Sequence, residues 1–228
     1  MTSLIEIGKK YPTNKNDYGF LDIYEKYFKN LKEKKLNILE IGVDKGDSLR
    51  LWKEYFTNAN ICGLDIDKKD FSIEGVKIYQ GDQNDKSLLD EIAKKYGKFD
   101  IIIDDGSHVS SHIINSFNHL FDHLSSNGLY IIEDLQTSYI PRYGGSRINL
   151  IKKNSSMNFF KSLSDSINYE NYDKPFFKKS RFDGLIKSIH FYPNIVFIFK
   201  GDSKKYFHSN VKNHFLDKFK KILSLFFR

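Results

Sequence analysis

Short apolar segments alternate with helix-like segments along most of this sequence, and this alternation restricts the fold more than any other feature. Strand-like runs occupy residues 37–43, 60–66, 76–80, 99–104 and 129–133, and helical spacing fills 47–56, 86–96 and 112–124. Nearly continuous apolar strands are typical of parallel strands that are buried on both faces. The sequence therefore predicts an α/β fold with a mostly parallel sheet covered by helices.

The alternation stops after Tyr139. A glycine-bearing loop at 141–146 leads to a predicted helix at 156–166, and residues 168–179 are polar, aromatic and irregular. Two further strand-like runs, 185–191 and 195–200, flank a tight turn at Tyr192-Pro193-Asn194, which indicates an antiparallel hairpin. We thus expect seven strands in a Rossmann-like sheet that ends in a hairpin. We divide the chain into a cap (1–35), a main domain (36–204, with 140–184 as a substrate-side lid) and a C-terminal helix (205–228).

The composition limits the partners. A net charge of +7 fits a basic nucleic-acid-binding module, but the lysines are mixed with acids over the whole chain and form no stripe. We expect no nucleic-acid partner and keep that module as an alternative. A basic surface also suits an anionic acceptor. The single cysteine, Cys62, excludes an internal disulfide and a cysteine-rich zinc site.

Two features bear on location. The N-terminus lacks the basic-then-apolar pattern of a signal peptide, and no apolar run approaches the ~18 residues of a spanning helix. We therefore expect a cytoplasmic protein. Near the C-terminus, lysines lie largely off a stripe of apolar residues that recur at helical spacing. The apolar residues are Phe215, Phe219, Ile222, Leu223 and Phe226. This pattern fits a helix on an anionic membrane surface, or, as we favour, one packed on its own domain or on a second subunit in a homo-oligomer.

The first strand and the helix after it carry the spacing E-x-G-x-x-x-G, formed by Glu40, Gly42 and Gly46. The glycines permit a tight turn and close ligand approach, and the helix start, where Ser48 lies, offers free N–H groups. The spacing differs from G-x-G-x-x-G, which admits a pyrophosphate, so NAD is disfavoured and S-adenosyl-L-methionine (SAM) is favoured. Acids and amides at later strand ends complete the predicted cofactor set: Asp65, Asp82, Gln83 and Asp104.

Two acidic clusters follow the fourth and fifth strands. Neighbouring parallel strands lie ~4.8 Å apart, so Asp105, Glu133 and Asp134 would converge. Converging carboxylates raise one another's pKa unless a cation sits among them, and oxygen ligands favour Mg2+, then Mn2+. The alternative is that these acids cap helices or pair with lysines.

Histidine titrates near neutral pH, so His108, three residues beyond Asp105, is our candidate general base, with Asp105 as the second catalytic residue. A zinc site at His108 and His112 is weakly supported because no H-E-x-x-H acid is present. His119 and His123 have the same i,i+4 spacing, and we expect them on a helix surface with no role.

Residues 103–108 (I-D-D-G-S-H) and 130–139 (Y-I-I-E-D-L-Q-T-S-Y), with Tyr143-Gly144-Gly145 and the hairpin, resemble the metal-dependent macrolide and sugar O-methyltransferases. The resemblance covers roughly residues 10–200 and implies a class I methyltransferase fold. It implies that Asp105, Glu133 and Asp134 bind the metal and that His108 is the base. Thr13 and Lys15 occupy a family segment that usually reads T-D-K, and we place them with the cofactor. The resemblance places three residues with the substrate: Thr137, Tyr139 and Tyr143.

The expected function is methyl transfer from SAM to a hydroxyl of a sugar or glycosylated acceptor, as in surface polysaccharide or natural-product biosynthesis. Vicinal sugar hydroxyls would be natural bidentate ligands of the metal. A small phosphorylated or catechol-like acceptor and an NAD-linked sugar-modifying oxidoreductase are the enzymatic alternatives.

Overall fold

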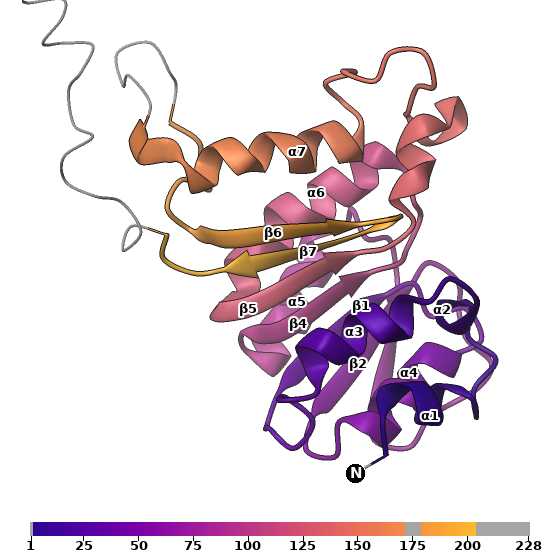
Figure 1. The fold of residues 1–228 in the computed structure, drawn as a ribbon. Helices are drawn as coiled ribbons and strands as arrows, with labels where there is room; N and C mark the ends of the chain where they lie inside the picture. Colours follow the sequence, from indigo (N-terminus) through magenta and orange to yellow (C-terminus); the bar gives the residue numbers. More distant parts are fainter. Residues whose placement is uncertain (1, 172–178, 204–228) are drawn as a thin grey trace, which may run out of the picture.

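The computed structural model describes residues 2–171 and 179–203, and the predicted C-terminal helix at 205–228 lies outside them. One seven-stranded sheet forms the centre, in the order β3-β2-β1-β4-β5-β7-β6 (Figure 1). The first five strands are parallel, β7 runs antiparallel to β5, and β6 pairs antiparallel with β7. The strands are β1 (Asn37–Ile41), β2 (Asn60–Asp65), β3 (Val76–Gln80), β4 (Phe99–Asp104), β5 (Leu124–Ile132), β6 (Ile186–Tyr192) and β7 (Ile195–Lys200). The predicted α/β class, strand number and terminal hairpin are confirmed.

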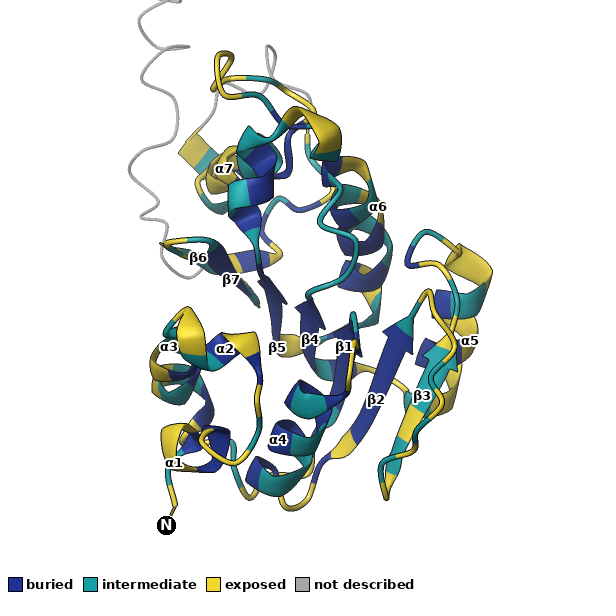
Figure 2. Ribbon diagram, turned by 90° about the vertical axis from the view of Figure 1, so that its right-hand side faces the viewer, coloured by how far each residue is buried: buried dark blue, intermediate teal, exposed yellow. Residues whose placement is uncertain are grey.

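Helices cover both faces of the sheet. On one face lie α1 (Leu4–Gly8), α3 (Phe20–Phe28) and α4 (Asp47–Tyr55), and on the other α5 (Lys86–Tyr96), α6 (Ser110–Leu120) and α7 (Ser156–Ile167). Alternate strand residues enter opposite cores: Ile101 and Ile103 of β4 pack on the first face, and Ile102 packs on the second. Figure 2 shows the central strands buried between these layers. Burial on both faces explains why the strands are continuously apolar.

The N-terminal segment belongs to the same packing unit as the sheet. Leu4 and Ile7 of α1 and Tyr24 of α3 share one hydrophobic core with Ile38 and Trp52. A short helix, α2 (Asn14–Asp17), follows within the same segment, and Thr13 caps it by accepting a hydrogen bond from the Lys15 N–H. Neither α1 nor α2 shows helical periodicity in the sequence, because each is only about one turn long.

The connection between α6 and β5 differs from the prediction. We expected a helix to Leu124 and a strand from Leu129, whereas α6 ends at Leu120, a 3-10 turn η1 (Phe121–His123) follows, and β5 begins at Leu124. The turn-like residues 125–128 belong to the strand because Leu124 pairs with Phe99 and a register shift then restores pairing at Leu129. Pairing along the neighbouring strand outweighs the local preference for a turn.

The segment after β5 forms short helical turns before the hairpin. They are η2 (Leu135–Tyr139), η3 (Pro141–Tyr143) and, after α7, η4 (Tyr169–Asn171). Part of the segment that we expected to be a lid is core, because Phe160 and Leu163 of α7 are buried against the sheet. The predicted turn connects β6 to β7, with Asn194 at a positive φ of 64°. Within the part of the chain that the structure describes, no helix is both long and apolar enough to cross a membrane.

Candidate active site

The sequence-predicted residues gather where the sheet order reverses, at the carboxyl ends of β1, β4 and β5. The residue after each strand continues the ladder: the Asp105 N–H donates to Ile41 O at 2.9 Å, and the Glu133 N–H donates to Asp104 O at 3.0 Å. Gly42, with φ of 89°, lies so close that a Cβ there would meet Asp105 O at 2.0 Å. This reversal point is where open α/β sheets bind ligands.

A cavity of about 430 Å³ opens at this point. Its walls come from the loops after β1, β2 and β4, from α2 and the residues just before it, and from the start of α4. Seven sequence-predicted residues line it: Thr13, Lys15, Gly42, Ser48, Asp65, Asp105 and His108. A smaller cavity of about 210 Å³ adjoins it, shares Gly42 and Asp65, and is lined by the predicted Asp82 and Gln83. Residues predicted to bind the cofactor thus line both of these neighbouring cavities.

Asp65 lies between the two cavities, and the protein already holds its carboxylate. Its Oδ2 accepts from the Val43 N–H at 2.8 Å and from the Asp44 N–H at 3.1 Å, and Lys69 Nζ lies 2.9 Å away. Burial raises the pKa of Asp65, but these hydrogen bonds and that from the Asp67 N–H outweigh burial, so the pKa is below its usual value. Asp65 is therefore ionised and fixed in orientation.

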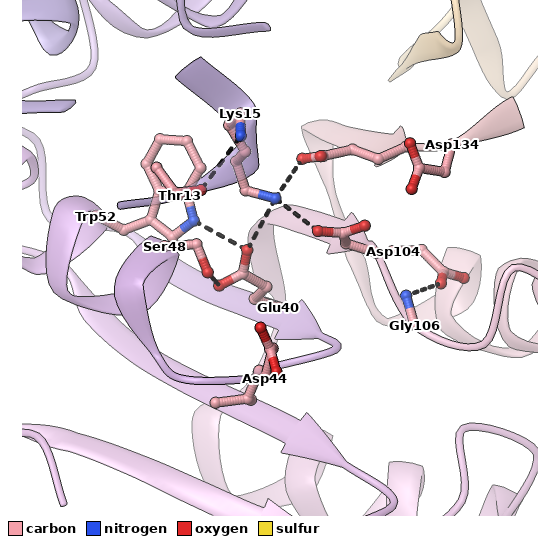
Figure 3. A network of polar contacts seen from close by, with 12 residues as sticks. Thr13, Lys15, Glu40, Asp44, Ser48, Trp52, Asp104, Gly106 and Asp134 are labelled. Carbon is pink, nitrogen blue, oxygen red and sulfur yellow. Dashed lines mark hydrogen bonds and ion pairs between the residues drawn. The ribbon is translucent and has the colours of Figure 1, made fainter. Parts of the chain in front are cut away.

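Three residues predicted to bind the cofactor lie behind the cavity walls. Glu40 is fully buried and accepts hydrogen bonds from Ser48 Oγ at 2.8 Å and Trp52 Nε1 at 3.2 Å (Figure 3). Gly46, with φ of 81°, precedes α4, where a Cβ would meet the Phe71 ring at 2.6 Å. Neither these two residues nor Asp104 line the two cavities. Glu40, Gly46 and Asp104 instead support the loops that line the cavities.

Asp104 is buried beneath the loop that follows β4. Its carboxylate accepts from Ser116 Oγ at 2.7 Å and from Gln83 Nε2 at 3.3 Å, while Gln83 Oε1 accepts from the Ser107 N–H. Burial raises the pKa of Asp104 to about 6 despite these hydrogen bonds. Asp104 thus ties β4, α6 and the Gln83 loop together under the pocket.

Lys15 places its ammonium among three carboxylates. Its Nζ lies 2.7 Å from Asp105 Oδ2, 2.9 Å from Glu133 Oε1 and 3.6 Å from Glu40 Oε1, and its side chain is only 1% exposed (Figure 3). Burial lowers the pKa of Lys15, but the carboxylates, Asp105 first, raise it well above its usual range. The alternative that acids at these strand ends pair with a lysine is therefore realised for Asp105 and Glu133.

The structure brings two of the three predicted metal ligands together with the predicted base. Ligand atoms of Asp105, His108 and Asp134 lie within 4.8 Å of one another, and His108 Nε2 is 3.6 Å from Asp134 Oδ2. Glu133 lies outside this group and accepts a hydrogen bond from the Tyr24 hydroxyl. Burial raises the pKa of Glu133 to about 8, although Lys15 opposes the shift. The oxygen-rich donor set fits a hard divalent ion.

The backbone conformation fixes the directions of the Asp134 and His108 side chains. Asp134 and His108 both have positive φ, 54° and 58°, which non-glycine residues adopt only when their surroundings hold them. Thr137 Oγ1 donates to His108 O at 3.1 Å and Asp134 O at 2.7 Å, so it links the two loops. The Leu135 N–H donates to Asn194 O at 2.9 Å, which anchors the same turn to the hairpin.

The residues that we predicted to bind substrate lie on this side of the sheet, in η2 and η3. Thr137 is buried in the loop contacts just described, whereas Tyr139 and Tyr143 are partly exposed. Neither tyrosine lines the two cavities. Sequence reasoning missed Tyr24 and Ser116, because each looks like an ordinary helix residue until the fold places it against Glu133 or Asp104.

Comparison with known proteins gives close relatives, although no family model matches the chain. The mycinamicin VI 2''-O-methyltransferase of Micromonospora griseorubida is 39% identical over 211 residues, which cover 87% of this chain and 52% of that protein. An 8-demethyl-8-alpha-L-rhamnosyl tetracenomycin-C 2'-O-methyltransferase of Streptomyces olivaceus is 36% identical over 186 residues, 78% of this chain and 49% of the relative. The chain thus spans about half the length of these curated relatives.

Among solved structures, the MycE methyltransferase of the mycinamycin biosynthetic pathway superposes with a TM-score of 0.84 at 36% identity. The match covers 90% of this chain and 55% of MycE, which was solved in complex with Mg, SAH and mycinamycin VI. The resemblance that the sequence motifs indicated is confirmed. By sequence and by fold, this chain is a homologue of the macrolide and sugar O-methyltransferases, with the class I methyltransferase fold.

Proposed function

We propose that this protein is a SAM-dependent, divalent-metal-assisted O-methyltransferase that acts on a hydroxyl of a sugar or glycosylated acceptor, in the biosynthesis of a surface polysaccharide or natural product. One observation carries the proposal. Asp105 and His108 line the 430 Å³ cavity, and the Asp105 carboxylate also lies beside that of Asp134 in the group that could hold a metal ion. The cofactor cavity and the metal group therefore share a wall, as methyl transfer between two bound molecules requires.

The relatives support the acceptor class. The tetracenomycin-C relative is named for a substrate that carries a rhamnosyl group, and MycE binds Mg and SAH. An NAD-linked oxidoreductase and a nucleic-acid-binding module are not favoured by these relatives. A sugar hydroxyl is preferred over a catechol-like or phosphorylated acceptor on the same grounds.

Each group has a distinct task in the proposed reaction. When bound, the divalent ion would lower the pKa of an acceptor hydroxyl, and SAM would supply the methyl group. The hydroxyl oxygen forms the new C–O bond as the sulfonium C–S bond breaks, which leaves SAH. His108 accepts the hydroxyl proton, and Asp134, 3.6 Å from its Nε2, stabilises the resulting imidazolium. Asp105, Asp134 and, as the resemblance implies, Glu133 would hold the ion.

The test separates metal binding from proton transfer. Asp105→Asn should abolish transfer and weaken Mn2+ binding, because it removes one carboxylate from the group that could hold the metal ion. Electron paramagnetic resonance measures the Mn2+ binding. His108→Gln should retain metal and SAM binding, measured by calorimetry, while kcat falls by about two to four orders of magnitude. EDTA should inhibit the unaltered protein, and Mg2+ should restore activity.

The control is Asp90→Asn, which changes a carboxylate outside both cavities and should leave transfer unchanged. Full activity of the unaltered protein in excess chelator would refute the metal-assisted mechanism. Transfer at a normal rate by His108→Gln would assign that residue to structure only. The cytoplasmic location, the homo-oligomer and membrane contact through residues 205–228 stay predictions.

A further inference from the structure

A second group of metal-binding side chains lies between α5 and α6, outside both cavities. It consists of Asp90 on α5, His119 in the last turn of α6 and His123 at the end of η1. Their ligand atoms all lie within 4.8 Å of one another. From sequence we expected the two histidines on a helix surface without a role, and the tertiary structure adds the carboxylate.

The three side chains already converge on one point. His119 Nε2 and His123 Nε2 each lie 2.9 Å from Asp90 Oδ1. An ion bound tetrahedrally with bonds of ~2.0–2.1 Å places its ligand atoms about 3.3 Å apart. Asp90 Oδ1 therefore needs to move away from each histidine nitrogen by only a few tenths of an ångström, and the Asp90 side chain, 56% exposed, is free to make that adjustment.

The backbones that carry these ligands are held firmly. Leu89 and Ile92 of α5 and Phe117 and Leu120 of α6 are buried in one core, so the helices cannot slide past each other without disrupting it. The turn that carries His123 is fixed by two lysines: Lys98 Nζ donates to Asp122 O, and Lys200 Nζ donates to Phe121 O and Leu124 O. Rigid ligands lose little entropy when an ion binds.

The surrounding charges and exposure leave room for an ion. Lys98 and Lys200 are engaged with backbone carbonyls, and Arg181 pairs with Asp122 at 2.6 Å. The histidine side chains are 19% and 26% exposed, so water can complete the coordination. His123 precedes the first residue of β5, whereas Glu133 follows the last, so this group and the active site lie at opposite ends of that strand.

We propose that Asp90, His119 and His123 form a second divalent-metal site, selective for Zn2+ and similar borderline ions, which joins α5 to α6. Two imidazoles and one carboxylate suit Zn2+, Ni2+ or Cu2+, whereas Mg2+ and Ca2+ prefer oxygen ligands only. A bound ion replaces the two N–H donors that now face Asp90. It replaces the hydrogen bonds that join Asp90 to the two histidines with metal–ligand bonds, and because it binds only the folded chain it should stabilise the folded state.

Zn2+ titration of tag-free, EDTA-treated full-length protein tests the site. Calorimetry in millimolar Mg2+, which occupies oxygen-ligand sites, measures Zn2+ binding, and thermal unfolding measures its effect on Tm. The unaltered protein should bind Zn2+ at this site, and Tm should rise by about 2–6 °C at saturation. Asp90→Asn and His119→Gln should each weaken that binding by about tenfold or more and remove the rise in Tm.

Two control variants test whether Zn2+ binds at Asp90, His119 and His123 and not elsewhere. His112→Gln alters another histidine of α6, and Asp105→Asn alters the active-site group, so both should retain the Zn2+-dependent rise in Tm. A rise that is unchanged in His119→Gln would overturn the proposal. Loss of all Zn2+ binding in the Asp105→Asn variant would also overturn it, because the Zn2+ would then bind at the active site. Because Asp90 and His119 lie outside both cavities, loss of Zn2+ binding in Asp90→Asn with normal methyl transfer separates this site from the proposed function.

Discussion

At the scale of single residues, Lys15 is the unusual feature. A buried ammonium is stable only when neighbouring charges replace its hydration, and here Asp105, Glu133 and Glu40 do so within 3.6 Å. Lys15 therefore neutralises part of an acidic cluster that would otherwise repel itself. It comes from α2, at the far N-terminal end of the chain, so it also connects the cap to the strand ends.

Lys15→Met should destabilise the metal-free protein by about 3–5 kcal/mol, because it leaves the buried carboxylates of Glu40 and Glu133 and the partly buried one of Asp105 without their cation. Urea unfolding in EDTA measures this loss, and Mg2+ should reduce it by supplying positive charge. Lys10→Met is the matched control, since Lys10 pairs with Glu54 at the surface, where an ion pair contributes about 0–1 kcal/mol. Equal unfolding midpoints for both variants would contradict this role of Lys15.

At the scale of elements, the close approach of β1 and β4 brings the cofactor loop and the acidic loop together. Gly42 permits that approach, because its φ is 89° and a Cβ added there would lie only 2.0 Å from Asp105 O, which leaves no space for a side chain. The hairpin has a comparable effect on the far side, since Asn194 O holds the N–H of Leu135 directly after Asp134. Two loops and one turn thus set the distances in the site.

Gly42→Ala should therefore displace the loop after β1, lower SAM affinity at least about tenfold and destabilise the protein by roughly 1–3 kcal/mol. Calorimetry with SAH and urea unfolding measure the two effects. Gly19→Ala is the matched control: Gly19 also has a positive φ, 67°, but an added Cβ would meet nothing within 4 Å. A Gly42→Ala variant that binds SAH normally would show that this close approach is dispensable.

At the scale of the whole molecule, the sheet separates two hydrophobic cores. The site lies at the carboxyl ends of the central strands, where both cores end. Cys62 in β2 reports on this packing, because it is fully buried and burial raises the pKa of its thiol to about 12. Its unfolded pKa is ~8.5. The stability that the neutral thiol contributes is therefore complete below pH ~8.5 and is lost as the pH rises toward 12.

Cys62 should consequently react with a thiol reagent at pH 8 only when the protein unfolds. The labelling rate should increase with urea in parallel with the loss of circular dichroism, since the thiolate and access both require unfolding. Cys62→Ala should abolish labelling altogether. Rapid modification of the native protein, with its circular dichroism unchanged, would show that β2 opens locally.

The sequence by itself determined the α/β class, the seven strands and the hairpin, because buried parallel strands and a tight turn each leave a local pattern of residue types. It also located the acids at the strand ends, since a strand end is a position along the chain. Only the tertiary structure decided which acids meet. It placed Lys15 between Asp105 and Glu133, buried Asp104 beneath the pocket, and grouped Asp134 with His108. These pairings join residues up to 118 positions apart, from Lys15 to Glu133. They depend on the pairing of strands and on loops with positive φ, which periodicity along the chain does not encode.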